Sequence, residues 1–352
     1  MVRATLKNLG ARKLRLLTTA LSVLLGVAFM AGTMVLTDTV TRTFDDLFAT
    51  VYKGVDAQVR SASKASADGM EQRARIDESL VATVKAVDGV RDAAGGVLGY
   101  TQIVGRDGKA IGNPGRGAPT FGTSWHDNPA FNAFHLVEGR APAKAGEITI
   151  DRFSATRGRL HVGDTTTLLV NGPPVQETVV GITRFGAADS PGGASIVQFP
   201  PAEAQRLAAE PGKFDSISVQ AANGVTQTEL QKRLRSVLPA DVQVLTGAQV
   251  VREQQAGMQK NLAFFGTFML AFALISLFVG AFIIYNTFSI IVAQRTREMA
   301  LLRAIGASRR QVMASVVGEA AIVGLIASVL GVVTGIGVAV GLESLLHALG
   351  MD

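Results

Sequence analysis

Few residues in this sequence have the types and spacing that catalysis requires. The 352 residues include four histidines and no cysteine, so thiol catalysis, disulfides and cysteine metal sites are excluded. The chain contains no G-x-S-x-G nucleophile turn and no H-E-x-x-H helix, and its histidines lack metal-ligand spacing. We therefore predict no enzymatic activity, no bound cofactor and no metal. The histidines are His126, His135, His161 and His347.

Nucleotide chemistry is also unsupported. The segment from Gly105 to Lys109 has neither the spacing nor the hydroxyl residue of a G-x-x-x-x-G-K-[ST] loop, so the chain should not hydrolyse ATP by that route. Trp125, the only tryptophan, lies beside His126 in a glycine-rich region. A lone tryptophan there favours a packing anchor over an aromatic binding patch.

Three long apolar segments divide the chain into its predicted domains. Uncharged runs occupy residues 16–36, 261–294 and 320–342, each long enough to cross a hydrocarbon core of about 30 Å as a helix. The first run exceeds the length of a signal-peptide core, which favours a retained span over a cleaved signal. We predict an integral membrane protein with three α-helical spans, at 16–38, at 259–293 with a preceding stalk, and at 311–342.

The basic residues predict the orientation. They cluster in residues 1–15, a predicted cytoplasmic amphipathic N-terminus, and in residues 294–310 between the second and third spans. Lys and Arg concentrate on the cytoplasmic side of a membrane, and two spans separate the clusters, so both can be cytoplasmic. The net charge of +6 therefore reflects membrane contact, and we expect no nucleic-acid partner. The chain should lie in the plasma membrane as a multi-pass protein.

Residues 39–258 should form a mixed α+β extracytoplasmic domain, because short β-type runs alternate there with amphipathic patterns. We predict one helix over 76–87 and another that begins with a capping box at Thr226 and Glu229. Glycine-rich residues 112–123 and 186–193 should be loops. The predicted strands are 147–150, 165–170, 175–182, 195–199, 216–219 and 242–245.

The segment 294–310 is the most informative stretch. Met299, Leu302 and Ile305 fall on one helical face, and Gly306 is well placed to end that helix. Ser308 and Gln311 then form a capping box that starts the next helix. The pattern predicts a short amphipathic helix, a tight turn and the third span.

The string from Arg297 to Gln311 resembles the signature of FtsX/MacB-type ABC transporter permeases. The run Glu138 to Pro142 followed by Glu147-Ile148, and His161 to Asp164 leading to Val179 to Ile182, resemble the same family. The resemblance implies a permease subunit whose cytoplasmic loop docks on a separate ABC-type ATPase that carries ATP and Mg. The implied coupling surface is Arg297, Glu298, Leu302, Arg303, Gly306 and Ala307.

The resemblance further implies a homodimer or pairing with a second permease half, contact with membrane lipids, and an extracytoplasmic protein partner. The family normally has a fourth span, so the tail at 343–352 reads as a truncated extracytoplasmic end. The predicted function is ATP-driven movement of the external domain for export or extraction of a lipid, lipoprotein, peptide or drug. The alternatives are an FtsX-like mechanotransmitter controlling a cell-wall hydrolase and a non-transporting membrane-anchored sensor or scaffold.

The third span contains a glutamate and a series of glycines, and each of these two features supports a prediction. Glu319 places an ionisable group about 12 Å along the helix, where it is costly unless it is paired, faces water or snorkels to the interface. Small residues at four-residue spacing allow helices to approach closely. We expect such packing at Gly331, Gly335, Gly337 and Gly341.

Overall fold

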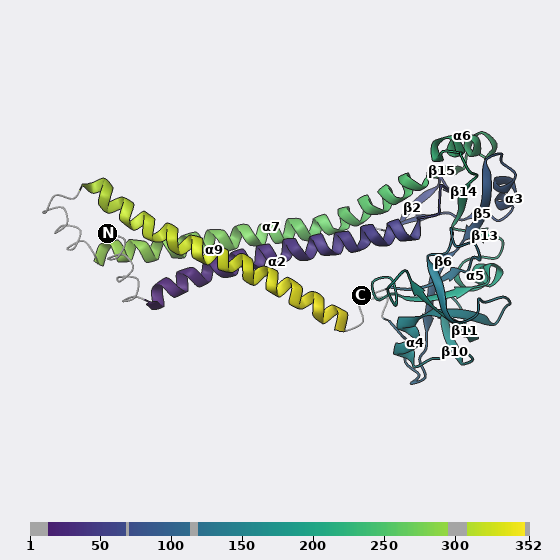
Figure 1. Cartoon of the computed structure of the whole chain (residues 1–352), viewed down its shortest axis with the longest axis horizontal. Helices are drawn as coiled ribbons and strands as arrows, with labels where there is room; N and C mark the ends of the chain where they lie inside the picture. Colours follow the sequence, from purple (N-terminus) through teal and green to yellow (C-terminus); the bar gives the residue numbers. More distant parts are fainter. Residues whose placement is uncertain (1–12, 68–69, 113–118, 295–307, 349–352) are drawn as a thin grey trace. The chain divides into compact units, whose positions relative to one another are not determined.

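The computed structural model describes residues 13–67, 70–112, 119–294 and 308–348 (Figure 1). It divides into two compact units. A helical unit contains residues up to Thr43 and Met258–Leu345, and the other unit consists mainly of Phe44–Gly257. The division falls inside three long helices.

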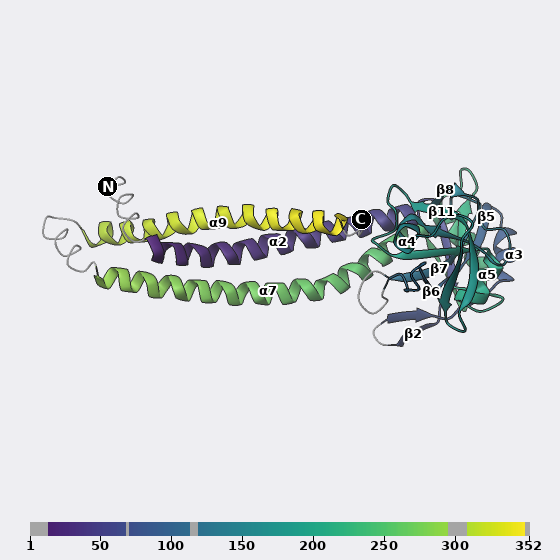
Figure 2. The same ribbon diagram turned by 90° about the horizontal axis from the view of Figure 1, so that it is seen from below.

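Three long helices contribute to the helical unit: α2 (Lys13–Val51), α7 (Gly247–Gln294) and α9 (Arg309–Ala348). Figures 1 and 2 show that the start of α2, the end of α7 and the start of α9 lie at the same end of this unit. Helix α7 is continuous from Gly247 to Gln294, so the predicted stalk and second span form one helix.

Two segments among the described residues are long and apolar enough to cross a membrane, Val23–Val51 and Ala321–Leu342. The apolar stretch of α7, Gly266–Phe282, is shorter. The first segment extends well beyond the predicted limit at residue 38, because α2 continues as a helix through Thr39 to Val51.

One lobe of the second unit is an antiparallel sheet in the order β15-β1-β14-β5, formed by β1 (Ala57–Ser61), β5 (Val90–Gly96), β14 (Ser216–Ala221) and β15 (Val242–Thr246). Helix α6 (Gln227–Val237) buries Leu230 and Leu234 in a core that also contains Val59, Ile217 and Val219. The alternating apolar residues of the strands and the apolar stripe of the helix bury one another.

The other lobe closes into a barrel. Its strands run in the order β10-β6-β7-β12-β9-β11, and β11 also pairs with β10, while β8 adds to the outside of β11. The sheet is mixed, because β9 and β11 are parallel, as are β7 and β12, while its other neighbouring strands are antiparallel. The members are β6 (Leu98–Ile103), β7 (Thr120–Ser124), β8 (Phe134–Gly139), β9 (Glu147–Asp151), β10 (Thr165–Val170), β11 (Val175–Phe185) and β12 (Ser195–Phe199).

Short elements complete the second unit. Helix α4 (Arg152–Gly158) follows β9, and α5 (Pro201–Ala208) follows β12. Two small two-stranded sheets pair β2 (Lys64–Ala67) with β3 (Met70–Arg73) and β4 (Ile76–Asp77) with β13 (Lys213–Phe214). The mixed α+β prediction is therefore confirmed for this unit.

Three local predictions need correction. The helix expected over 76–87 is α3 (Leu80–Lys85), because Ile76 pairs with Phe214 as a strand and Asp77 accepts hydrogen bonds from Ser79. The loop expected over 112–123 contains part of strand β7. Gly122 is required in that strand because a Cβ there would lie 2.3 Å from the Thr101 hydroxyl.

The third correction concerns the capping box at Thr226. The Thr226 hydroxyl accepts from the backbone N–H of Glu229 at 3.2 Å, as predicted. The Glu229 carboxylate instead accepts from Arg233 at 3.0 Å. Half of the predicted box forms, because an arginine one turn along the helix is a stronger partner for a carboxylate than a backbone N–H.

Candidate functional site

Small residues on α9 form its contact with α2. Within the helical unit, a Cβ at Gly335 would lie 2.4 Å from the carbonyl oxygen of Ala28, and one at Gly331 would lie 2.8 Å from Cβ of Val27. The buried residues Ala327 and Ala339 extend the same row at four-residue spacing. The contact is therefore a close backbone approach that larger side chains would prevent.

The four predicted packing glycines do not share one face. Gly331 and Gly335 meet α2, whereas a Cβ at Gly337 or Gly341 would meet no atom within 4 Å in the described part of the chain. Helix α7 contacts α2 elsewhere, through the Phe29 and Phe272 rings at 5.4 Å. Glu319 lies within α9, but its side chain is outside the described residues.

The start of α7 is held to the four-stranded sheet by a polar network. Glu253 on α7 accepts hydrogen bonds from Arg60 of β1 and from Arg73 of β3. Gln243 of β15 accepts from Arg60 Nη2 at 3.2 Å. The Arg60 side chain is only 9% exposed, so this charge depends on its partners.

The end of α2 reaches the same network. Tyr52, which follows α2 directly, lies near Gln58 of β1 and Gln254 of α7, and burial raises the pKa of its hydroxyl by more than those two side chains lower it. Residues from both long helices and from the sheet therefore meet at one junction inside the second unit. We call Tyr52, Arg60, Arg73, Gln243 and Glu253 the stalk junction.

The run from Glu138 to Glu147 connects β8 to β9 and is held in place by hydrogen bonds to the Glu147 side chain. Arg140 donates two hydrogen bonds to Glu147, at 2.7 and 2.5 Å, and the backbone N–H of Ala143 donates a third at 3.1 Å. These donors lower the pKa of Glu147 to about 2. Gly139 adopts φ +74°, where a Cβ would lie 2.2 Å from the carbonyl oxygen of Val180. The structure therefore explains why this run contains Arg140, Glu147 and Gly139, because the first two form an ion pair and the third allows a close backbone approach.

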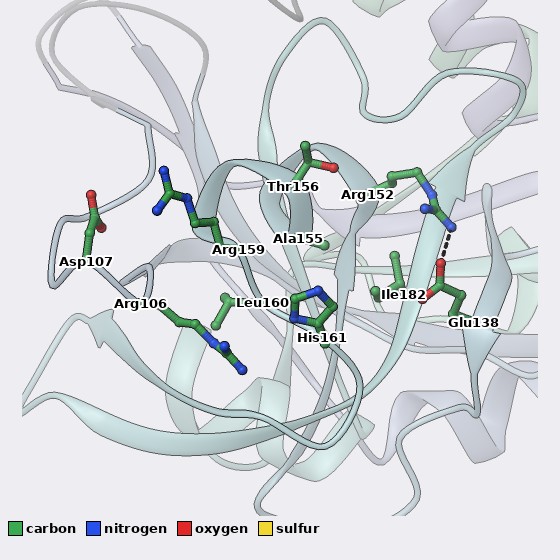
Figure 3. A pocket seen from close by; sticks show the side chains of 10 residues that line it. All are labelled: Arg106, Asp107, Glu138, Arg152, Ala155, Thr156, Arg159, Leu160, His161 and Ile182. Carbon is green, nitrogen blue, oxygen red and sulfur yellow. Dashed lines mark hydrogen bonds and ion pairs between the residues drawn. The ribbon is translucent and has the colours of Figure 1, made fainter.

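A pocket of about 730 Å³ opens beside α4 (Figure 3). Figure 3 shows Arg106, Asp107 and Arg159 on one side of it and Arg152 with Glu138 on the other. Arg152 donates to Glu138 at 2.7 Å. The remaining lining residues are Ala155, Thr156, Leu160, His161 and Ile182.

Buried carboxylates lie at two places in the barrel lobe, a pair of glutamates at one and a single aspartate at the other. Glu177 on β11 lies beside Glu203 on α5, which accepts two hydrogen bonds from Arg206. Burial, followed by repulsion from Glu203, raises the pKa of Glu177 to about 7. Asp151 caps α4 by accepting from the N–H and hydroxyl of Ser154, and its burial raises its pKa to about 7. Among the described residues, no group of three or more acidic or histidine side chains is arranged to hold a metal ion.

The predicted coupling surface, Arg297, Glu298, Leu302, Arg303, Gly306 and Ala307, lies outside the described residues. The capping box that follows it is confirmed. The Ser308 backbone N–H donates to the Gln311 side chain at 2.9 Å, and the Gln311 N–H donates to the Ser308 hydroxyl at 3.3 Å. Helix α9 therefore begins where the sequence predicted.

Two family models match this chain. The MacB-like periplasmic core domain matches residues 16–237, and the FtsX-like permease C-terminal matches residues 270–349. The first match alone covers more than half of the chain and includes most of α2, the barrel lobe and the four-stranded lobe up to the end of α6. The chain belongs to the FtsX/MacB-type ABC transporter permeases.

Similar proteins include other members of this family. An uncharacterized ABC transporter permease protein of Mycobacterium tuberculosis is 30% identical over 234 residues, 65% of this chain and 26% of that protein. The macrolide export ATP-binding/permease protein MacB of Bdellovibrio bacteriovorus is 22% identical over 346 residues, 94% of this chain and 52% of that protein. The chain thus spans between about a quarter and about half of the length of these curated relatives.

The periplasmic region of MacB from Actinobacillus actinomycetemcomitans is a similar solved structure. It is 13% identical, with a TM-score of 0.41, and the match covers 57% of this chain and 94% of that one.

Sequence reasoning missed two structural features of this FtsX/MacB-type chain. The stalk junction combines residues between Tyr52 and Glu253, which no local pattern links. The pocket combines the loop after β6 with α4 and β8. The spacing of Arg152 and Arg159 at the two ends of a short helix was a signal that could have suggested the pocket.

Proposed function

We propose that this chain is a permease subunit that couples ATP hydrolysis by a separate ABC-type ATPase to movements of its extracytoplasmic domain. Three spans, at 16–38, 259–293 and 311–342, would hold it in the plasma membrane as a multi-pass protein. The movement would drive export or extraction of a lipid, lipoprotein, peptide or drug. The chain would contribute no cofactor of its own, since ATP and Mg would bind to the ATPase.

The stalk junction is the observation that carries this proposal. A movement imposed on α7 needs a rigid attachment to act on the sheet, and the Glu253 bonds to Arg60 and Arg73 provide one. The Arg60 and Arg73 side chains are largely buried, although Glu253 is partly exposed, so separating Glu253 from them would leave two poorly solvated charges without their carboxylate. Continuity of the helix from Gly247 to Gln294 supports the same mechanism.

Gly337 and Gly341 form a second row of small residues on α9, and this row supports a partner within the membrane. Gly337 and Gly341 are exposed and meet no atom within 4 Å in the described part of the chain. Close packing of a second copy, or of a second permease half, against this row would use the same chemistry as the α2 contact.

Affinity purification tests the ATPase partnership. The tagged full chain should copurify from its host membranes with an ATP-binding subunit, and the complex should hydrolyse ATP. Gly306→Trp and Glu298→Arg should each reduce the copurified ATPase at least tenfold, because both change the predicted coupling surface. Glu210→Arg, a charge reversal at an exposed position of the other unit, is the matched control. A folded chain that captures no ATPase, or that loses it equally in the control, contradicts the proposal.

A further inference from the structure

The charges of the pocket beside α4 favour an anion. Three arginines and two carboxylates line it, and a further carboxylate, Asp164, pairs with Arg106, so within the described residues Arg159 is the arginine of the pocket that no carboxylate binds. A volume of about 730 Å³ falls in the range of small-molecule sites. Its floor includes the apolar side chains of Ala155, Leu160 and Ile182.

Two of the arginines are fixed but retain donors. Arg106 donates through Nη2 to Asp164 at 2.6 Å, and Arg152 donates through Nη2 to Glu138 at 2.7 Å. A guanidinium carries five N–H donors, so each of these arginines can still bind a ligand. The side chain of Asp164 also accepts from the backbone N–H of His161 at 2.8 Å, which stabilises the loop that presents the pocket.

Arg159 is the arginine of the pocket that has no partner among the described residues. Within the described residues its side chain makes no hydrogen bond or ion pair. Asp107 lies on the same side of the pocket in Figure 3, but its carboxylate accepts from the backbone N–H of Lys109 at 3.1 Å. A guanidinium that lines a pocket with all its donors available is suited to a ligand oxygen.

The backbone of Arg159 is strained. It caps α4 with φ 53° and ψ 39° and is the one non-glycine residue with positive φ in the described part of the chain. Glycine is the usual residue at such a helix end, because other residues adopt this conformation at a cost. Gly158 before it has a separate packing role, since a Cβ there would lie 2.7 Å from Ile111. A non-glycine residue that stays strained at a position that glycine could occupy without strain is typical of a residue retained for function.

We infer that this pocket binds a single phosphate group, with Arg159 and the remaining donors of Arg106 as its ligands. Arginine recognises phosphate through several parallel hydrogen bonds. Glu138 and Asp107 oppose a polyanion and favour a phosphate carried on a hydroxylated or amine-bearing molecule. The phosphate could belong to a soluble phosphate ester or to a phospholipid headgroup. This inference does not depend on the proposed ATPase coupling.

Calorimetric titration of the full chain in a non-ionic detergent tests the inference. One arm uses glycerol 3-phosphate and the other uses dihexanoyl phosphatidylglycerol below its micelle concentration. Arg159→Ala should raise the Kd of the bound probe at least tenfold. Arg157→Ala is the matched control, because Arg157 is exposed on the same helix and does not line the pocket; it should change the Kd less than twofold.

Arg159→Gly separates binding from folding. This variant removes the guanidinium and relieves the strained backbone, so it should lose the probe while its Tm stays equal to or above that of the wild type. Binding in only one arm supports the inference and identifies the source of the phosphate. No binding in either arm by the folded wild type overturns it, as does an equal loss in the Arg157 and Arg159 variants.

Discussion

At the scale of single residues, two glutamates of the barrel lobe show how surroundings decide ionisation. Glu147 accepts three hydrogen bonds from Arg140 and Ala143, and its pKa falls to about 2. Glu177 is 3% exposed, its Oε2 has no partner in the described part of the chain, and its pKa rises to about 7. Donors stabilise a carboxylate, whereas burial and a neighbouring carboxylate destabilise it.

The raised pKa of Glu177 predicts that the second unit loses stability as the pH rises. The folded state holds this proton up to about pH 7, whereas an unfolded glutamate releases it near about pH 4.3. Stability should therefore fall between these values, by up to about 3–4 kcal/mol, since each pKa unit corresponds to about 1.4 kcal/mol. Glu177→Gln should remove the part of this pH dependence that Glu177 contributes, whereas Asp151, whose pKa burial also raises to about 7, should keep its own part.

Fluorescence of Trp125 measures this effect, because the chain has one tryptophan and it lies in the second unit. Thermal unfolding of the full chain in detergent would be followed at about pH 5 and about pH 8. Glu210→Gln, at an exposed position, should leave the slope unchanged. Equal slopes in wild type and Glu177→Gln would contradict the prediction.

At the scale of elements, α9 presents two rows of small residues with different surroundings. Ala327, Gly331, Gly335 and Ala339 are buried, and the two glycines of this row meet α2. Gly337 and Gly341 are exposed. The same residue type therefore serves an internal contact on one side of α9 and leaves an open surface on another.

A large residue on the buried row should separate α9 from α2. Gly335→Leu should destabilise the helical unit by about 1–3 kcal/mol, because its Cβ would lie 2.4 Å from a backbone oxygen of α2 that cannot move alone. Gly337→Leu has open space in the described part of the chain and is the matched control. Loss of helical circular dichroism on heating in detergent measures the difference, and equal melting of the two variants would contradict the prediction.

At the scale of the whole molecule, the stalk junction is where the start of α7 is hydrogen-bonded to strands of the second unit beside the end of α2. Glu253 satisfies two arginines from different strands. The Arg60 side chain is largely buried, so removal of Glu253 would leave it without its carboxylate. The cost of such a loss is about 1–3 kcal/mol.

Glu253→Ala should uncouple the proposed movement from ATP hydrolysis. Because the chain has no cysteine, Asp241→Cys gives a unique site for a spin label in the second unit. In the complex with the ATPase, the label-to-label distance between two copies should change with ATP in the parent and not in Glu253→Ala, while ATP hydrolysis persists.

The matched control for this uncoupling experiment is Glu210→Ala, which removes an exposed carboxylate of the same unit and should preserve the change. An ATP-dependent change that survives Glu253→Ala would show that the junction does not transmit movement.

The sequence predicted elements whose signals are local. Strands β9, β10 and β12 begin where their apolar runs predicted, and the Ser308 box is a contact between neighbours in the chain. The predicted start of α3 at residue 76 was wrong, because Ile76 pairs as a strand with the distant Phe214 in spite of its helical pattern. Strand β7 was missed, because its glycine reflects packing against Thr101 and not a turn.

The sequence by itself therefore determined the apolar segments, the α+β character of the second unit, the local caps and the family, since each depends on composition, periodicity or a continuous motif. Tertiary structure alone decided which glycines of α9 meet α2, how β11 closes the barrel onto β10, and that Tyr52, Arg60 and Glu253 share one network. It also brought Arg106, Arg152 and Arg159 to one pocket. These features depend on contacts between residues far apart in the chain, which no local pattern encodes.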